Sequence, residues 1–196
     1  MPMNQPDIPS AAAAIAATQA WMEKAVIGLN LCPFAKAVHV KQQIRYAVST
    51  AITLDDLLDD LESELRILSQ TAPEMIDTTL LIHPQMFTVF LDYNDFLEVA
   101  DATVRDLGFA GTLQIASFHP DYRFADTALD DITNYTNRSP YPMLHLLRES
   151  SLDAAVAAFP DAAKIYLKNM ETMRRLGQPG WAALGLDSPV VVSCRD

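Results

Sequence analysis

The apolar and polar residues of this chain follow a helical period in some segments and a strand period in others. Leucines at helical spacing predict a helix over 54–68, where they occupy positions 54, 57, 58, 61, 65 and 68. A second apolar stripe predicts a helix over about 92–108. Short apolar segments predict three strands, over 43–49, 78–84 and 112–120. The resulting order, strand–helix–strand–helix–strand, is typical of a parallel sheet with right-handed crossovers.

Further helices are predicted on both sides of this unit. Ser10 can cap a helix that runs to about Gly28, and a last helix extends from about Asp161 to about Leu176. Pro140 and Pro142 fit the first turn of a helix, so we predict one that begins near Ser139 and contains the segment MLHLLRES. An apolar run over 189–194 predicts an edge strand.

These elements predict an α+β fold with an α/β-like core. We expect a small, mainly parallel sheet of three to four strands, covered by the N-terminal and C-terminal helices. A ferredoxin-like arrangement is the alternative, if a fourth strand pairs antiparallel. At 196 residues the chain fits a single domain, 1–196, with a loose tail over 1–9.

Charge and cysteine content narrow the functional classes. The net charge of -11 repels phosphate backbones, which argues against nucleic-acid binding. Six carboxylates within 54–64 are interpreted as the solvated face of one helix. Two distant cysteines suit a reducing compartment, and no segment has the length of a membrane span. Since no basic residue precedes the N-terminal alanines, we expect no secretory signal and a cytoplasmic protein without membrane contacts.

Two predicted strands end with the same dipeptide, His-Pro. If both strands are parallel members of one sheet, His83 and His119 leave it at the same edge, where ligands of parallel sheets gather. Their imidazoles can share a pocket, or they can simply cap local backbone groups. With Asp121, Asp130 or Asp131 they can also supply a metal site, which is the weaker alternative because no close ligand spacing is present.

The segment TNRSPYPMLHLLRES contains the residue types of an anion site. The predicted helix would present free backbone N–H groups at Ser139, with Arg138 directly before it. His145 and Arg148 would share one face of that helix because they are three residues apart. The alternative is that Ser139 is a helix cap and that the arginines pair with nearby acids.

Cys32 directly precedes Pro33 in the segment NLCPFAK. If Pro33 begins a short helix, Cys32 caps it, and the helix dipole favours a nucleophilic thiolate. The alternative is a buried thiol that packs with Leu31 and Phe34. Glycine-rich phosphate loops and nucleophile elbows are absent from the sequence.

The blocks GLNLCPFAK, ASFHPDYRF and NYTNRSPYPMLHLLRE resemble the bacterial family catalogued as domain of unknown function 1415. The similarity extends from about Trp21 to Gly177 and implies no established activity, cofactor or catalytic residue. It does imply that several of the residues discussed above match signature blocks of the family, together with Asn30 and Asn137.

We therefore expect a small enzyme that binds an anionic metabolite, a phosphate or a carboxylate, beyond the strand ends. The predicted catalytic residues are His119, Cys32 and His145. The predicted substrate-binding residues are Arg138, Ser139, Arg148, Asn134, Asn137 and His83. The alternatives are a metal-dependent enzyme that uses His83 and His119, and a non-catalytic binding module in which the polar loop is held by its own hydrogen bonds. Neither the residues nor the resemblance identifies a cofactor.

Overall fold

The computed structural model describes residues 8–158 and 164–186. Its central element is a four-stranded sheet with the order β1-β2-β4-β3. The strands are β1 (Ile44–Val48), β2 (Thr78–Ile82), β3 (Leu113–Phe118) and β4 (Met143–Arg148). The two crossover helices are α3 (Leu54–Gln70) and α4 (Phe90–Asp106). The three predicted strands and both predicted crossover helices are therefore present.

The prediction of a mainly parallel sheet is wrong. β1 and β2 are parallel, but β4 lies between β2 and β3 and is antiparallel to both. The alternative with an antiparallel fourth strand anticipated this kind of pairing. Since β2 and β3 both oppose β4, the three predicted strands still run in the same direction.

The segment predicted as a helix after Ser139 forms the strand β4. Its apolar run, Met-Leu-His-Leu-Leu, satisfies helical spacing and also suits a strand buried on both faces, and such runs cannot be separated by periodicity alone. β4 occupies an interior position of the sheet, and its Leu144 and Leu146 are fully buried. Tertiary packing therefore decides the conformation of this segment.

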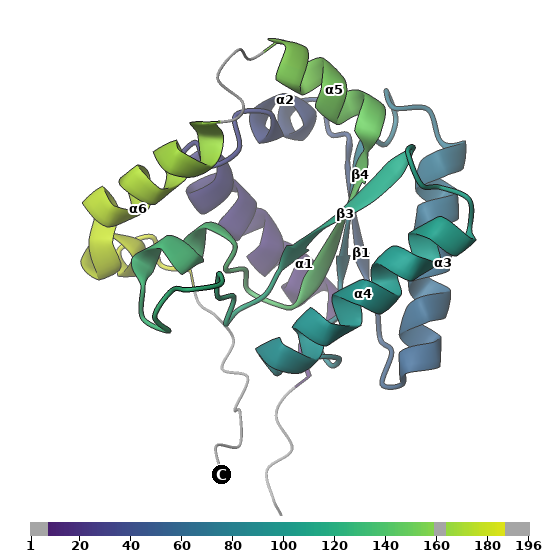
Figure 1. Cartoon of the computed structure of the whole chain (residues 1–196), viewed down its shortest axis with the longest axis horizontal. Coiled ribbons are helices and arrows are strands. Elements are labelled where there is room, and N and C mark those ends of the chain that lie inside the picture. The colour runs from purple at the N-terminus through teal and green to yellow at the C-terminus, as the bar shows by residue number, and fades with distance from the viewer. Residues whose placement is uncertain (1–7, 159–163, 187–196) are drawn as a thin grey trace, which may run out of the picture.

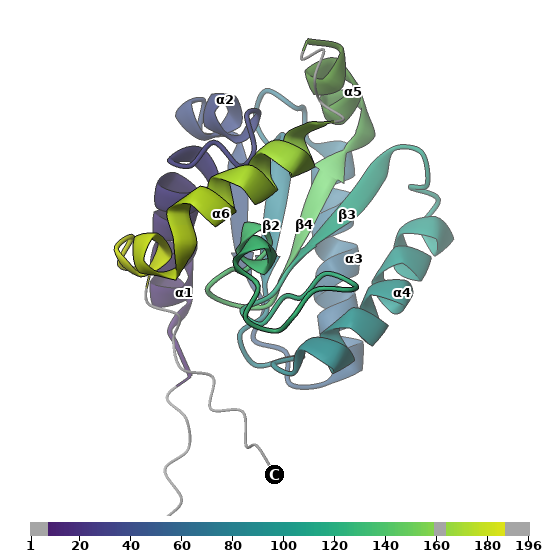
Figure 2. The ribbon, with the colours of Figure 1, turned by 60° about the vertical axis from the view of Figure 1, so that its left-hand side comes forward.

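Helices cover the sheet on both faces (Figure 1, Figure 2). On one face, α3 and α4 bury the leucine stripe of α3 against Leu81, Leu144 and Leu146. On the other face, α1 (Ala11–Trp21) and the π-helix η1 (Met22–Ile27) pack Trp21 and Ala25 against a second cluster, which includes Leu80, Ile82 and Met143.

The remaining helices are α2 (Ala35–Val40), α5 (Glu149–Ala158) and α6 (Ile165–Ala182), and the short helix η2 (Ile132–Thr136) packs against α6. Of these, α5 directly follows β4 and the others lie on the side of this second face (Figure 1). The T-shaped contact of Tyr135 with Trp181, with centroids 5.0 Å apart, is part of that packing. α6 is interrupted at Gly177, whose φ of 63° permits the change of direction.

The structure describes only part of the chain ends for which elements were predicted. Ser10 caps α1 as predicted, because its side chain accepts a hydrogen bond from the Ala13 N–H. Most of the predicted tail, the proposed start of the last helix at Asp161 and the predicted strand over 189–194 lie outside the described residues. Across the described ranges, no helix is both long enough and apolar enough to cross a membrane.

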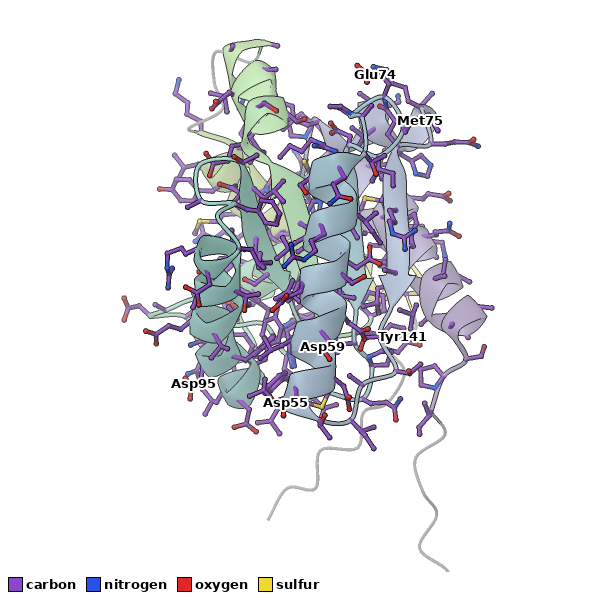
Figure 3. All side chains as sticks on the ribbon, turned by 90° about the vertical axis from the view of Figure 1, so that its right-hand side faces the viewer. Asp55, Asp59, Glu74, Met75, Asp95 and Tyr141 are labelled. Carbon is purple, nitrogen blue, oxygen red and sulfur yellow. The ribbon has the colours of Figure 1, made fainter. Side chains whose placement is uncertain are left out.

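The acidic segment of α3 is mostly, but not wholly, a solvated face. Asp55 and Asp59 are exposed, as is Asp95 of α4, and Figure 3 shows all three at the surface. Glu64, the last of the six carboxylates, is instead 8% exposed and pairs with Arg45. The interpretation of all six as solvent-facing is therefore wrong for Glu64.

Candidate functional site

His83 and His119 follow the parallel-running strands β2 and β3, and the aromatic ring of Tyr93 contacts both. The ring centroid of Tyr93 lies 5.8 Å from that of His83 and 5.1 Å from that of His119. Both histidines are almost completely buried, at 1% and 0% exposure. Both histidines thus leave the sheet at one edge, as predicted. There they are buried among aromatic rings.

The imidazole of His119 has both nitrogens in hydrogen bonds to backbone. Nδ1 accepts from the Asp121 N–H at 2.9 Å, so Nε2 carries the proton and donates to the Phe87 carbonyl at 3.0 Å. Burial lowers the pKa of His119 and keeps the ring neutral. Through these hydrogen bonds His119 connects the start of the polar loop, which joins β3 to β4, to the segment before α4.

His83 has one satisfied and one unsatisfied nitrogen. Nδ1 donates to the Met86 carbonyl at 3.0 Å, while the buried Nε2 has no hydrogen-bond partner among the described residues. Burial lowers the pKa of His83 to about 4. The ring contacts those of Phe87 and Phe96 as well as that of Tyr93, so three aromatic rings border the imidazole.

The polar loop between β3 and β4 is held together by its own side chains. Asn134 accepts from the Phe124 N–H and the Thr127 hydroxyl, and its amide donates to the Ala128 carbonyl. The amide of Asn137 donates to the Ser117 carbonyl at 3.1 Å. These contacts are the ones expected of a loop that is packed by its own hydrogen bonds.

Arg138 and Ser139 are also directed toward backbone groups. Arg138 donates to the carbonyls of Tyr122 and Leu129, and its guanidinium lies 4.2 Å from the centroid of the Tyr135 ring. The Ser139 hydroxyl donates to the Tyr141 carbonyl at 2.6 Å. Because β4 replaces the predicted helix, the helix N-terminus expected at Ser139 does not exist.

His145 and Arg148 lie on opposite faces of β4, which corrects the prediction that they share a helix face. The Thr78 hydroxyl donates to the Leu146 carbonyl, so it accepts from Nε2 of His145 at 2.7 Å. Burial lowers the pKa of His145 to about 4. Arg148 instead reaches the end of α3, where it donates to the carbonyls of Leu68, Thr71 and Ile76.

Cys32 is a free, half-buried cysteine beside the second apolar cluster. The helix after it, α2, begins at Ala35 and its N-cap residue is Phe34, so Cys32 does not cap a helix as predicted. Residues 8–158 and 164–186 contain no group of three or more histidine, cysteine, aspartate or glutamate side chains that could hold a metal ion.

Two cavities border α6, and the side chain of Asn169 lines both. One, of about 260 Å³, is lined on its other sides by Asn30, Pro33, Lys168 and Arg175, among others. The second, of about 390 Å³, is bounded by η2 and the polar loop and includes Asn137. Both cavities therefore touch segments that resemble family signature blocks, those around Asn30 and Asn137.

Helical spacing and one hydrogen bond position the residues of these cavities. Lys168, Thr172 and Arg175 recur at intervals of four and three residues, which places them on one face of α6. The amide of Asn169 donates to the Leu31 carbonyl at 2.8 Å and thereby fixes α6 to the segment before α2. Asn30 adopts a φ of 55°, a left-handed conformation that asparagine tolerates better than most residues.

The predicted site residues are only partly brought together. His83, His119 and Arg138 lie in one region, but their hydrogen bonds are made to backbone groups, whereas Asn137 lines the second cavity. The cavity-lining residues of α6 were not among the predicted site residues. A polar stripe at Lys168, Thr172 and Arg175 was the signal available in the sequence.

The fold and the cavities together define a mixed α/β protein in which α6, broken at Gly177, borders two small cavities. The chain belongs to the family described as "Protein of unknown function (DUF1415)", which matches residues 13–183. Comparison with curated proteins and with solved structures gives no match.

Proposed function

We propose that this protein binds a small anionic metabolite in the two cavities beside α6. The observation that carries the proposal is the local charge of the smaller cavity. Lys168 and Arg175 line it together with one carboxylate, Glu171, so its charged residues sum to a positive value in a chain whose net charge is -11. The local positive charge favours the approach of an oxyanion to this region over the predominantly acidic remainder of the protein.

The neutral lining supports a ligand with a polar, uncharged body. Asn30, Asn169 and Thr172 supply amide and hydroxyl groups beside the two cations, and guanidinium offers paired donors to a carboxylate or a phosphate. The second cavity adds threonines and Asn137 next to Phe124 and Met170. The smaller cavity therefore offers charged groups to a ligand, the larger one offers both polar and apolar groups, and Asn169 lines both.

The sequence also predicts an enzyme, and in this proposal Cys32 is the candidate reacting group. Its neighbour Leu31 accepts the hydrogen bond of Asn169, and its other neighbour, Pro33, lines the smaller cavity. The thiol is free, as a nucleophile requires. By contrast, the buried His119 and the half-buried His145 both hold structural hydrogen bonds, which favours a supporting role for both.

The test is a titration with inorganic phosphate and with citrate, followed by NMR of the asparagine side-chain amides. We expect saturable shifts for Asn30 and Asn169 and an increase in thermal stability that grows with ligand concentration. Arg175→Gln should weaken binding about tenfold, as expected when one charge-assisted contact is lost. Arg105→Gln removes an exposed arginine from α4, outside the cavities, and is the matched control.

Equal affinities of the Arg175→Gln and Arg105→Gln proteins would show that only the overall charge matters, and the proposed site would be abandoned. If both anions bind as expected, a Cys32→Ser variant then separates binding from catalysis. The variant should retain the amide shifts. If the wild-type protein converts a bound ligand and the Cys32→Ser variant converts it at the same rate, the thiol is not the reacting group.

A further inference from the structure

We propose a second binding site, for a small organic cation, in the groove between η1, α2 and the edge strand β1. The groove has a volume of about 540 Å³, which lies within the usual size range of ligand pockets. Its polar lining consists of Gln19, Glu23, His39, Gln42 and Tyr46. None of these residues lines the cavities beside α6, so the inference is independent of the proposed anion site.

The charge of the groove selects a cation. Glu23 is the one carboxylate in the lining, and the lining contains no lysine or arginine. The nearest basic group to Glu23 is His39, whose Nε2 lies 3.6 Å from a carboxylate oxygen. That distance is too long for a hydrogen bond, so the lone pairs of the carboxylate stay available to a donor from a ligand.

Tyr46 supplies the second recognition element. Its hydroxyl oxygen is buried and has no hydrogen-bond partner among the residues that the structure describes. Buried polar groups in folded proteins are nearly always paired, and an exception requires an explanation. The oxygen has almost no accessible surface, so it can accept from a bound ammonium only after a small rotation of the side chain, while the ring attracts the positive charge.

The backbone around the groove is unusual at two points. Glu23 lies in the π-helix Met22–Ile27, a form that is rare and is often found at functional sites. Gln42, in the turn before β1, has a φ of 58°, which is uncommon for a residue with a side chain. Both features bring polar side chains to the groove: Glu23 from the helix and Gln42 from the turn before β1.

The ligand class follows from these contacts. The groove offers one carboxylate, two carboxamides, a phenol and an imidazole, all of which can accept N–H donors in at least one state. A compact amine or guanidine fits this set, and the net charge of -11 attracts such a molecule to the protein. An anion would be placed against Glu23 with no fixed cation to offset it.

The experiment uses putrescine as the probe and butanediol, which has the same carbon chain without charge, as the neutral comparison. Binding to the full chain is followed by NMR and calorimetry at low salt. We expect saturable binding of putrescine, centred on resonances of Glu23, Gln42 and Tyr46, and none of butanediol. Glu23→Gln should weaken it about tenfold or more, and Tyr46→Phe should weaken it several-fold.

Glu62→Gln is the matched control, because Glu62 is a carboxylate of α3 outside the groove. It should change putrescine affinity less than about twofold, as expected for a screened surface charge. Tyr46→Phe removes an oxygen that has no partner, so the fold should be retained. Equal losses in the Glu23 and Glu62 variants, or no saturable binding at about 10 mM putrescine, would refute the site.

Discussion

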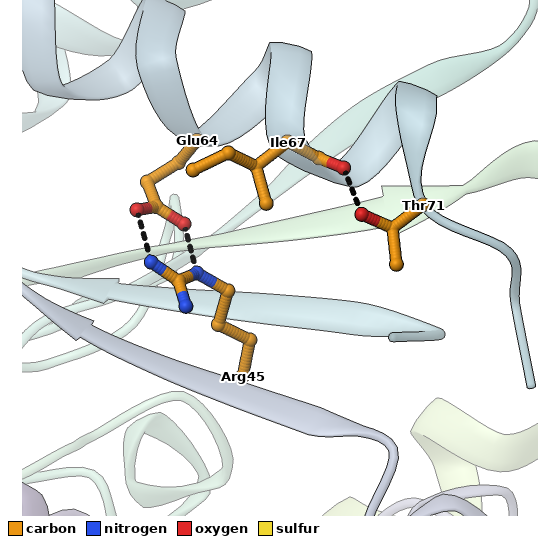
Figure 4. Close-up of polar contacts among 4 residues, drawn as sticks. All are labelled: Arg45, Glu64, Ile67 and Thr71. Carbon is orange, nitrogen blue, oxygen red and sulfur yellow. Dashed lines mark hydrogen bonds and ion pairs between the residues drawn. The ribbon is translucent and has the colours of Figure 1, made fainter. Parts of the chain in front are cut away.

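Arg45 and Glu64 form a two-pronged ion pair that joins the edge strand β1 to the buried face of α3 (Figure 4). The guanidinium donates from Nε at 2.6 Å and from a terminal nitrogen at 2.9 Å to the two carboxylate oxygens. The hydrogen bond to Glu64 raises the pKa of Arg45. Since β1 pairs with only one strand within residues 8–158 and 164–186, this ion pair is a second anchor for that side of the sheet.

Glu64→Gln should lower the free energy of unfolding by about 1–3 kcal/mol. The substitution removes the charge of a nearly buried carboxylate and leaves the Arg45 guanidinium without its partner. The side chain of Arg45 is 38% exposed, so water offsets part of the loss and keeps it below the value for a fully buried pair. Urea denaturation of the purified variant measures the change.

The control is Glu62→Gln on the same helix. Glu62 lies 3.5 Å from Arg66, one turn away, and both side chains are well exposed. Such pairs contribute less than about 0.5 kcal/mol, so this variant should unfold like the wild type. A similar loss of stability in the two variants would show that burial of Glu64 does not strengthen its ion pair with Arg45.

Tyr93→Phe should destabilise the protein by about 1–3 kcal/mol. The buried hydroxyl donates to the Met143 carbonyl at 2.8 Å and accepts from the Phe118 N–H at 3.2 Å. Burial raises the pKa of Tyr93, so the proton stays in place to be donated. The variant keeps the ring between the histidines and loses both hydrogen bonds, which chemical denaturation will detect.

Tyr166→Phe provides the comparison, because Tyr166 is 62% exposed on α6. Removal of this exposed hydroxyl should change the free energy of unfolding by less than about 0.5 kcal/mol. Hydrogen exchange adds a local measurement: in Tyr93→Phe the Phe118 amide should exchange faster, while amides in the centre of β2 keep their protection. An unchanged Phe118 amide would contradict the assigned hydrogen bond.

His83 should make the protein less stable as pH falls. Burial lowers its pKa from the ordinary 6.5 to about 4, so between these values the unfolded chain binds more protons than the folded one. Stability attributable to this residue is complete above pH 6.5 and declines toward pH 4, by a total on the order of 3 kcal/mol. Denaturation curves recorded across this range give the slope.

His83→Asn tests this assignment. The asparagine amide can replace Nδ1 as the donor to Met86 but cannot be protonated, so the variant should show a shallower pH dependence over the same window. Tyr93→Phe is the control here, because it lowers stability at every pH and keeps the histidine. A His83→Asn slope equal to that of Tyr93→Phe would show that other groups cause the acid sensitivity.

Much of the fold follows from local pattern. The leucine stripe of α3 has a clear helical period, and the apolar runs of the first three strands are short and end at residues that disfavour a helix, so these elements were predicted correctly. β4 could not be predicted in this way. Its run of apolar residues fits two periods, and only its insertion between β2 and β3 selects the strand.

The candidate sites depend even more on tertiary contacts. That His83 and His119 reach one edge of the sheet was predictable, but the ring of Tyr93 between them was not. Asn30 and Asn169 are 139 positions apart and meet only because α6 folds back over the segment before α2. No local pattern encodes such a meeting, although the polar stripe at Lys168, Thr172 and Arg175 is present in the sequence.

Arg148 closes the C-terminal end of α3, and its loss should be the most damaging of the substitutions considered. Arg148→Ala leaves the carbonyls of Leu68, Thr71 and Ile76 without this donor and should cost about 2–4 kcal/mol. Arg148→Lys retains the charge but cannot reproduce the planar fork, so it should recover only part of the loss. Faster amide exchange over 71–76 should accompany both variants. Full recovery in Arg148→Lys would show that charge near the helix end, rather than the set of directed hydrogen bonds, stabilises this corner of the fold.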